Sequence, residues 1–133
     1  MPRANRKLIS FEELIWLHTV SIAEFGGSQS VRDRGLLESA LDRSRTGFEG
    51  HSLHATPIKR AADLAEALIQ NHGFIDGNKR TAMYAMGLWL DREGLKLEAA
   101  QNELVEFALG LAEHQLDLSA ASVWLETHVI SLA

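Results

Sequence analysis

The stretch AMYAMGLWL at residues 82–90 constrains the fold most, because at helical spacing it is apolar on nearly every side. A helix without a polar face must lie in the centre of a molecule, covered by other elements. The apolar run is nine residues long, whereas a membrane-spanning helix needs about 20. The sequence therefore predicts a central buried helix over residues 79–93, ended by Gly94.

Five further helices are predicted around this one. Ser10 and Glu13 have the spacing of a capping box ahead of a helix over residues 11–24. Asp33 is a suitable N-cap for the next helix, and Thr56 followed by Pro57 is a typical start of a third. The remaining predicted boundaries are residues 34–44 for the second helix, 102–113 for the fifth and 119–128 for the sixth, with Ser119 as its cap.

The fold class that follows is all-α, a bundle of about six helices in one domain over residues 1–133. This length suits one domain with its own core. Leu95, Leu97 and Ala99 alternate briefly and suggest a short extended segment. A short β-hairpin is a further prediction for residues 47–54, so little or no sheet is expected.

Composition excludes several classes of function. The formal net charge of −5 argues against a general nucleic-acid binder, which would show a basic face. Cysteine is absent, which rules out disulfides, thiolate catalysis and cysteine-based zinc sites. The basic N-terminus has no apolar stretch behind it, unlike a secretory signal. We therefore expect a cytoplasmic protein that does not enter membranes.

Residues 71–82, NHGFIDGNKRTA, form a glycine-bracketed loop that leads into the central helix. The N-terminus of a helix presents unpaired N–H groups and the positive end of the helix dipole, which suits an anion. Gly77 allows close approach of a ligand, and Asn78 is able either to cap the helix or to hold the loop. Lys79 and Arg80 are unfavourable at this position unless a polyanion binds there.

Two further groups complete a phosphate-transfer site. Asp76 is suited to a divalent ion that bridges phosphates. His72 continues the apolar stripe of the third helix, which predicts an inward position, and it can exchange a proton near neutral pH. The segment is not a Walker A loop, since Gly77 is followed by Asn78 rather than by lysine. The expected class is a nucleotide-dependent transferase.

The same segment resembles the Fic/Doc signature H-x-F-x-[DE]-G-N-[GK]-R. The positions that match are His72, Phe74, Asp76, Gly77, Asn78, Lys79 and Arg80. Residues 31–41 and the pair Trp124-Leu125 are also similar to the death-on-curing (Doc) branch, so the likeness spans roughly residues 7–125. Gly73 departs from the proline of many members, which we expect to loosen the loop without removing a functional group.

This resemblance implies an all-α Fic fold and a toxin of a type II toxin–antitoxin pair. It implies transfer of the γ-phosphate of ATP to a threonine or serine hydroxyl of elongation factor Tu, with Mg²⁺, and neutralisation by a cognate antitoxin. His72 would be the general base and Asp76 the metal ligand. Gly77, Asn78, Lys79 and Arg80 would bind the nucleotide phosphates, the last two with catalytic roles, and Phe74 would anchor the loop.

Two positions select the branch. Fic enzymes that transfer AMP have glycine where this chain has Lys79, and a second arginine where it has Met83. The alternatives that remain are AMP transfer by the same fold and a catalytically inactive binding module. The self-inhibitory motif [ST]-x-x-x-E-[GN] is not matched, which is consistent with inhibition by a separate chain.

Other clusters are interpreted more simply. His51 and His54 are at most half of a zinc site, or part of a flap that touches the target. Arg32 and Arg34 flank the cap Asp33 and are expected to be solvated charges. We assign no partner to His18.

Overall fold

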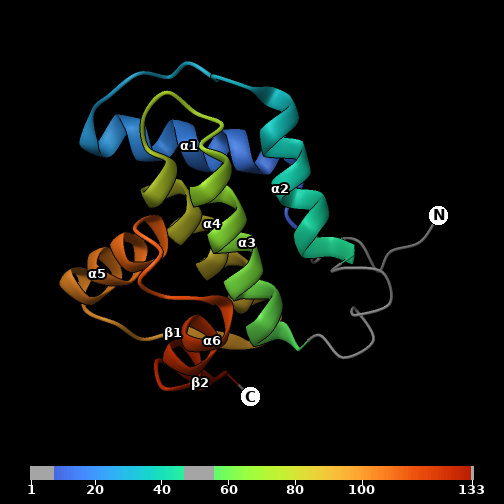
Figure 1. Ribbon diagram of the computed structural model, residues 1–133, viewed down its shortest axis with the longest axis vertical. Helices are drawn as coiled ribbons and strands as arrows, with labels where there is room; N and C mark the ends of the chain where they lie inside the picture. The colour runs from blue at the N-terminus through green and yellow to red at the C-terminus, as the bar shows by residue number, and fades with distance from the viewer. Residues whose placement is uncertain (1–7, 47–55, 133) are drawn as a thin grey trace.

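The computed structural model describes residues 8–46 and 56–132 of the chain (Figure 1). The hairpin predicted for residues 47–54 and the pair His51 and His54 lie outside the described residues. The elements of the described part are α1 (Phe11–Phe25), α2 (Arg34–Thr46), α3 (Pro57–Asn71), α4 (Asn78–Arg92), β1 (Leu95–Leu97), α5 (Gln101–Ala112), α6 (Leu118–Glu126) and β2 (Val129–Ser131). The all-α prediction is confirmed for these residues.

Helix α4 occupies the centre of the molecule, as its apolar sequence predicts. It contacts α1, α3, α5 and β1, and Figure 1 shows α3 and α4 side by side with α1 crossing one end of both. Its buried face includes Ala82, Ala85, Met86, Trp89 and Leu90. None of the helices among the described residues is both long and apolar enough to span a membrane.

The predicted start signals of three helices are confirmed by hydrogen bonds. In the capping box of α1, the Glu13 N–H donates to Ser10 Oγ at 3.1 Å and the Ser10 N–H donates to Glu13 Oε1 at 3.0 Å. Asp33 Oδ1 accepts from the Leu36 N–H at 3.1 Å, and Thr56 Oγ1 accepts from the Lys59 N–H at the same distance. These caps set where each helix begins.

The C-terminal part differs from the prediction. Helix α6 is capped by Asp117 rather than by Ser119, because the Asp117 carboxylate accepts from the Ala120 N–H at 2.8 Å. The helix ends at Glu126, two residues before the predicted end at His128, and β2 begins after it at Val129. This strand pairs antiparallel with β1, with Leu95 opposite Ser131. The extended segment at Leu95 and Leu97 was thus predicted, whereas its partner strand β2 was not.

Candidate active site

The signature loop begins where α3 ends. His72 is the C-cap residue of α3 and has left-handed backbone angles, φ 51° and ψ 52°. The prediction that His72 continues the buried stripe is therefore wrong: the chain leaves the helix at Asn71, and the imidazole is exposed. The left-handed region is strained for a residue other than glycine, by roughly 1–2 kcal/mol, and such strain gathers at functional sites. An exposed imidazole is accessible to a substrate.

A second segment, residues 28–33, runs beside the signature loop and holds it; we call it the strap. The Ile75 N–H donates to the Ser30 carbonyl at 3.1 Å, and Val31 and Phe74 form an isolated antiparallel bridge. The Gly73 carbonyl accepts from the N–H groups of strap residues 32 and 33, at 2.7 and 2.9 Å. The loop is thus paired like a short strand, although neither segment has a strand-like sequence.

Arg32 adds side-chain bonds to this pairing. Its Nε donates to the His72 carbonyl at 2.7 Å and its Nη2 donates to the Asn71 carbonyl at 3.0 Å. These carbonyls end α3 and have no helical partners of their own. Arg32 is exposed, as expected of a solvated charge, but the prediction gave its side chain no partner. Its guanidinium holds the backbone of His72 in its strained conformation.

Within the loop, Asn78 and Phe74 are joined by two hydrogen bonds. Asn78 Oδ1 accepts from the Phe74 N–H at 3.0 Å, and Asn78 Nδ2 donates to the Phe74 carbonyl at 2.9 Å. Phe74 is 1% exposed and Asn78 6%, so the amide closes the loop inside the protein. Of the two roles predicted for Asn78, the structure shows the second, holding the loop. Phe74 is the buried anchor that the resemblance implies.

Close packing explains why residue 73 is a glycine. A Cβ atom at this position would lie 2.4 Å from Cδ2 of Leu37, which is fully buried in α2. Real Cβ contacts are not that short, so α2 approaches the loop as closely as it does only because residue 73 is glycine. The loop is therefore supported by packing against Leu37, although residue 73 is not a proline.

The first turn of α4 has the features of an anion site. Gly77 is its N-cap at φ 82°, and neither a side-chain cap nor an acidic residue is present in this turn. The first helical hydrogen bond runs from the Thr81 N–H to the Gly77 carbonyl at 2.9 Å. The N–H groups of residues 78–80 therefore precede the helical ladder, where they are available to a ligand, beside the cations Lys79 and Arg80.

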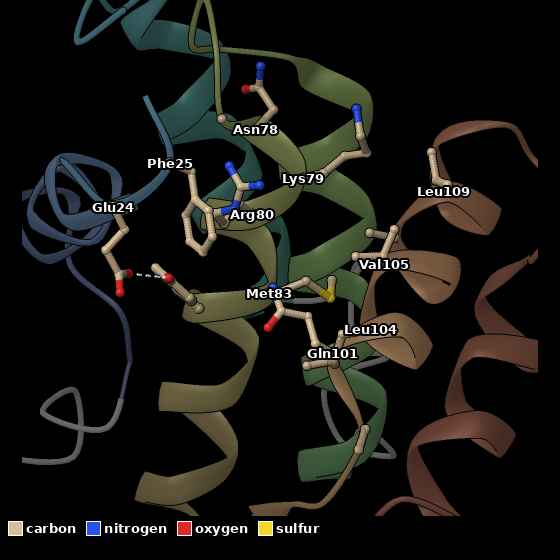
Figure 2. Close-up of a pocket in the computed structure, with 14 residues that line it drawn as sticks. Glu24, Phe25, Asn78, Lys79, Arg80, Met83, Gln101, Leu104, Val105 and Leu109 are labelled. Atoms are coloured by element: carbon tan, nitrogen blue, oxygen red, sulfur yellow. Dashed lines mark hydrogen bonds between the residues drawn. The ribbon is translucent and has the colours of Figure 1, made fainter. Parts of the chain in front are cut away.

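This turn opens on a cleft of about 630 Å³ between α1, α4 and α5 (Figure 2). Residues 77–80 line one end of it. The C-terminal end of α1 contributes Glu24 and Phe25, and α5 contributes an apolar wall with Leu104, Val105 and Leu109. The space is large enough for a drug-sized ligand.

Two of the charged side chains in this cleft, Arg80 and Glu24, have side-chain partners. The Arg80 guanidinium lies 3.7 Å from the centre of the Phe25 ring, a cation–π contact. Tyr84 Oη donates to Glu24 Oε1 at 2.5 Å. Burial and this bond to a carboxylate raise the pKa of the Tyr84 phenol. The tyrosine therefore stays a neutral donor at neutral pH.

Asp76 lies on the loop but is not among the residues that line the cleft. Its Oδ2 accepts from the Ser28 N–H at 2.8 Å, and the side chain is exposed. Among the described residues no group of three acidic or histidine side chains could enclose a metal ion. One exposed carboxylate nevertheless fits Mg²⁺, which is commonly held by one or two carboxylates together with substrate phosphates.

His18 is a component that the sequence analysis missed. It is buried in α1, and its ring stacks on Phe74 at a centroid distance of 3.7 Å. Its Nε2 lies 2.8 Å from the Asp76 carbonyl oxygen. One signal could have revealed it, because His18 lies four residues after Leu14 and therefore on the buried face of α1.

Known proteins match this chain over the same elements. The model of the Fic/DOC family matches residues 8–90. Toxin Doc of Mycolicibacterium smegmatis is 38% identical over 81 residues, which are 61% of this chain and 62% of that protein. Protein kinase doc of Escherichia phage P1 is 32% identical over 117 residues, 86% of this chain and 89% of that protein.

The family match contains the strap, the signature loop and most of α4, and the phage relative extends it over the greater part of the chain. The paired loop, the uncapped start of α4 and His72 therefore lie within the part of the chain that the family model matches. The chain belongs to the Fic/Doc family.

Proposed function

We propose that this chain is the toxin of a type II toxin–antitoxin pair and acts as an ATP-dependent protein kinase. It transfers the γ-phosphate of ATP to a threonine or serine hydroxyl of a translation factor, with elongation factor Tu as the expected target. The observation that carries the proposal is the uncapped, cationic first turn of α4, which opens on a cleft beside a loop that begins with an exposed imidazole. Relatives named as a Doc toxin and a Doc protein kinase support it.

The position of each residue in the site indicates its role. The N–H groups of residues 78–80 and the side chains of Lys79 and Arg80 bind phosphate oxygens at the mouth of α4. His72 accepts the proton of the target hydroxyl, a role open to an exposed imidazole. Asp76 would hold Mg²⁺, which would neutralise part of the phosphate charge. The two hydrogen bonds between Asn78 and Phe74 keep the loop that carries these residues in one conformation.

Two side chains favour phosphate transfer over AMP transfer. Lys79 would fill part of the space where a glycine would let a phosphate lie against the helix end, and it adds a charge there. Met83 lines the cleft where a second arginine would bind another phosphate. The orientation of the nucleotide decides which phosphorus lies in line with the hydroxyl, and only an in-line phosphorus reacts. The kinase orientation is the one this charge pattern supports.

A cognate antitoxin is the expected partner, since one of the relatives is a toxin by name. The apolar wall of α5 in the cleft includes Val105 and Leu109, which are exposed in this chain. A segment of the antitoxin that covers this wall would also close the cleft over Arg80. Inhibition would then be competitive with nucleotide.

Labelled ATP tests the proposal directly. The chain is incubated with elongation factor Tu, Mg²⁺ and ATP labelled at either the γ or the α position. We expect label on the target from γ-labelled ATP alone, and transfer about 10²–10⁴ times slower with a His72→Asn variant. Transfer from the α position would mean an adenylyltransferase. Absence of transfer from both positions, to this target and to a cell lysate, would support an inactive binding module.

A further inference from the structure

His18 is the only buried histidine among those that the structure describes. It contacts the signature loop at two points that are two residues apart in sequence. The ring face lies parallel to Phe74, with 3° between the planes and 3.7 Å between the centroids. The ring edge places Nε2 2.8 Å from the Asp76 carbonyl oxygen. One imidazole thus contacts both sides of the turn that presents the Asp76 carboxylate.

The second contact fixes the proton on the ring. A carbonyl oxygen can only accept a hydrogen bond, so His18 Nε2 must carry a hydrogen and donate it. This holds for the Nε2–H tautomer and for the doubly protonated ring alike. The other neutral tautomer, with its hydrogen on Nδ1, would place two acceptors against each other.

The bond also selects the orientation of one peptide group. The peptide between Asp76 and Gly77 is trans, so its C=O and N–H point in opposite directions. Since the carbonyl is held toward α1, the Gly77 N–H is directed away from α1. Glycine is tolerated at positive or negative φ, so the peptide before Gly77 is able to turn over unless something holds it. The observed φ of 82° belongs to the orientation that His18 holds.

We propose that His18 is a positioning residue for phosphate binding: it locks the Asp76–Gly77 peptide so that the start of α4 is organised before ATP arrives. This inference rests on the proposed function, which it deepens. His18 is not among the residues that line the cleft, so it acts through the loop and not on substrate. Its value lies in pre-organisation, because small misplacements of binding groups lower rates by large factors.

Two variants separate the parts of this contact. His18→Phe keeps a ring that can stack on Phe74 but has no donor. His18→Gln keeps an N–H donor at about the same reach. We expect His18→Phe to raise KM for ATP, and to lower kcat/KM for transfer to elongation factor Tu by about tenfold to a hundredfold. His18→Gln should recover most of this loss. His114→Asn is the matched control, since His114 is an exposed histidine in the turn after α5.

A purely structural role would give another pattern, in which both variants lower the melting temperature and leave KM for ATP unchanged. That result, or a His18→Phe variant as active as the parent, overturns the proposal. The change in KM for ATP, compared with the change in kcat, therefore decides between the two roles.

Nuclear magnetic resonance tests the positioning role of His18 without the need for transfer activity. In ¹⁵N-labelled parent protein, His18 Nε2 should carry a hydrogen, and the Gly77 amide should shift when Mg·ATP is added. The Gly77 response should be weakened in His18→Phe and kept in His18→Gln. If the parent transfers no phosphate but shows this pattern, the proposed function fails and the positioning role stands. An unprotonated Nε2 in the parent overturns the positioning role even if both variants fail to fold.

Discussion

The two ends of helix α4 follow opposite rules. At its C-terminal end, Arg92 lies in the last turn, where a cation is favourable, and forms an ion pair with Glu13 of α1. At its N-terminal end there is no side-chain cap, and two cations stand where the helix dipole disfavours them. The same helix thus has a favourable charge at one end and unfavourable charges at the other. Formation of the helix does not explain the cations at its N-terminal end.

The difference separates residues that serve stability from residues that serve a ligand. A local arrangement that costs free energy persists when something else depends on it, and such conflicts gather at functional sites. The favourable end of α4 holds α1 and α4 together. The unfavourable end opens on the cleft and becomes favourable when an anion occupies it. Loss of the ion pair at the C-terminal end should therefore lower stability and leave activity unchanged. Changes at the N-terminal end should lower activity or nucleotide affinity without lowering stability.

The largest effect is expected from His72→Asn. Asparagine tolerates left-handed backbone angles, so the variant keeps the loop conformation and loses only the imidazole. Loss of a general base typically lowers the rate by about 10²–10⁴. Transfer from γ-labelled ATP and growth arrest on expression are the measurements. An unchanged rate, with an unchanged melting temperature, would remove His72 from the mechanism.

Lys79→Glu should show opposite signs in stability and binding. An acidic residue in the first turn should stabilise the free protein by about 0.3–1 kcal/mol, because it complements the helix dipole. The same change places a negative charge against the phosphates, and we expect Mg·ATP affinity to fall by at least about tenfold. Thermal denaturation and isothermal titration calorimetry measure the two effects.

Lys59→Glu is the matched control for this variant. Lys59 is an exposed lysine in the first turn of α3, away from the cleft. It should stabilise the protein to a similar extent and leave nucleotide affinity unchanged. Equal losses of affinity in both variants would mean that net charge, and not the mouth of α4, controls binding.

Phe25→Leu should have a smaller effect at the same end. The ring of Phe25 supports the Arg80 guanidinium at 3.7 Å, and leucine would keep the apolar contact without the π face. An exposed cation–π contact contributes about 0.5–1 kcal/mol, so we expect Mg·ATP affinity to fall by about two- to fivefold. Phe25→Tyr should bind like the parent. A leucine variant with parental affinity would show that Arg80 does not need this support.

Much of the fold was predictable because its signals are local. The capping box at Ser10 and Glu13, the pair Thr56 and Pro57, and the glycines around the loop act through residues that are near in sequence. The central position of α4 was also predictable, since its composition leaves no face for solvent. The signature residues were found for a similar reason, because they lie in one unbroken segment.

What the sequence did not predict depends on contacts between distant segments. The exposure of His72 depends on a left-handed residue at the end of α3, and histidine is not a usual signal for that conformation. The bonds of Arg32 join it to carbonyls 39 and 40 residues away. His18 acts on a carbonyl 58 residues away. Neither residue type predicts such a partner, because arginine is usually solvated and histidine has many uses.

The smallest effect is expected at the favourable end, from Glu13→Gln. The hydrogen bond from Arg92 is the main reason that the pKa of Glu13 falls from 4.5 to about 2. A carboxyl whose pKa is lower in the folded state adds stability above its unfolded pKa, and this contribution is lost as the pH falls through the folded value. The ion pair should therefore stabilise the protein fully above about pH 4.5 and not below about pH 2.

Glutamine keeps the capping box, because its side-chain oxygen still accepts from the Ser10 N–H, and it removes the charge together with the second acceptor oxygen that Arg92 contacts. Glu13 is partly exposed, so solvent screens the pair and the expected loss is no more than about 0.5–1 kcal/mol at pH 7. Urea denaturation of parent and variant between pH 7 and pH 2 measures the difference, which should shrink over the acidic part of this range. Nucleotide affinity should not change. A difference that persists at pH 2 would assign the stabilisation to packing, and the contrast between the two ends of α4 would then rest on the N-terminal end alone.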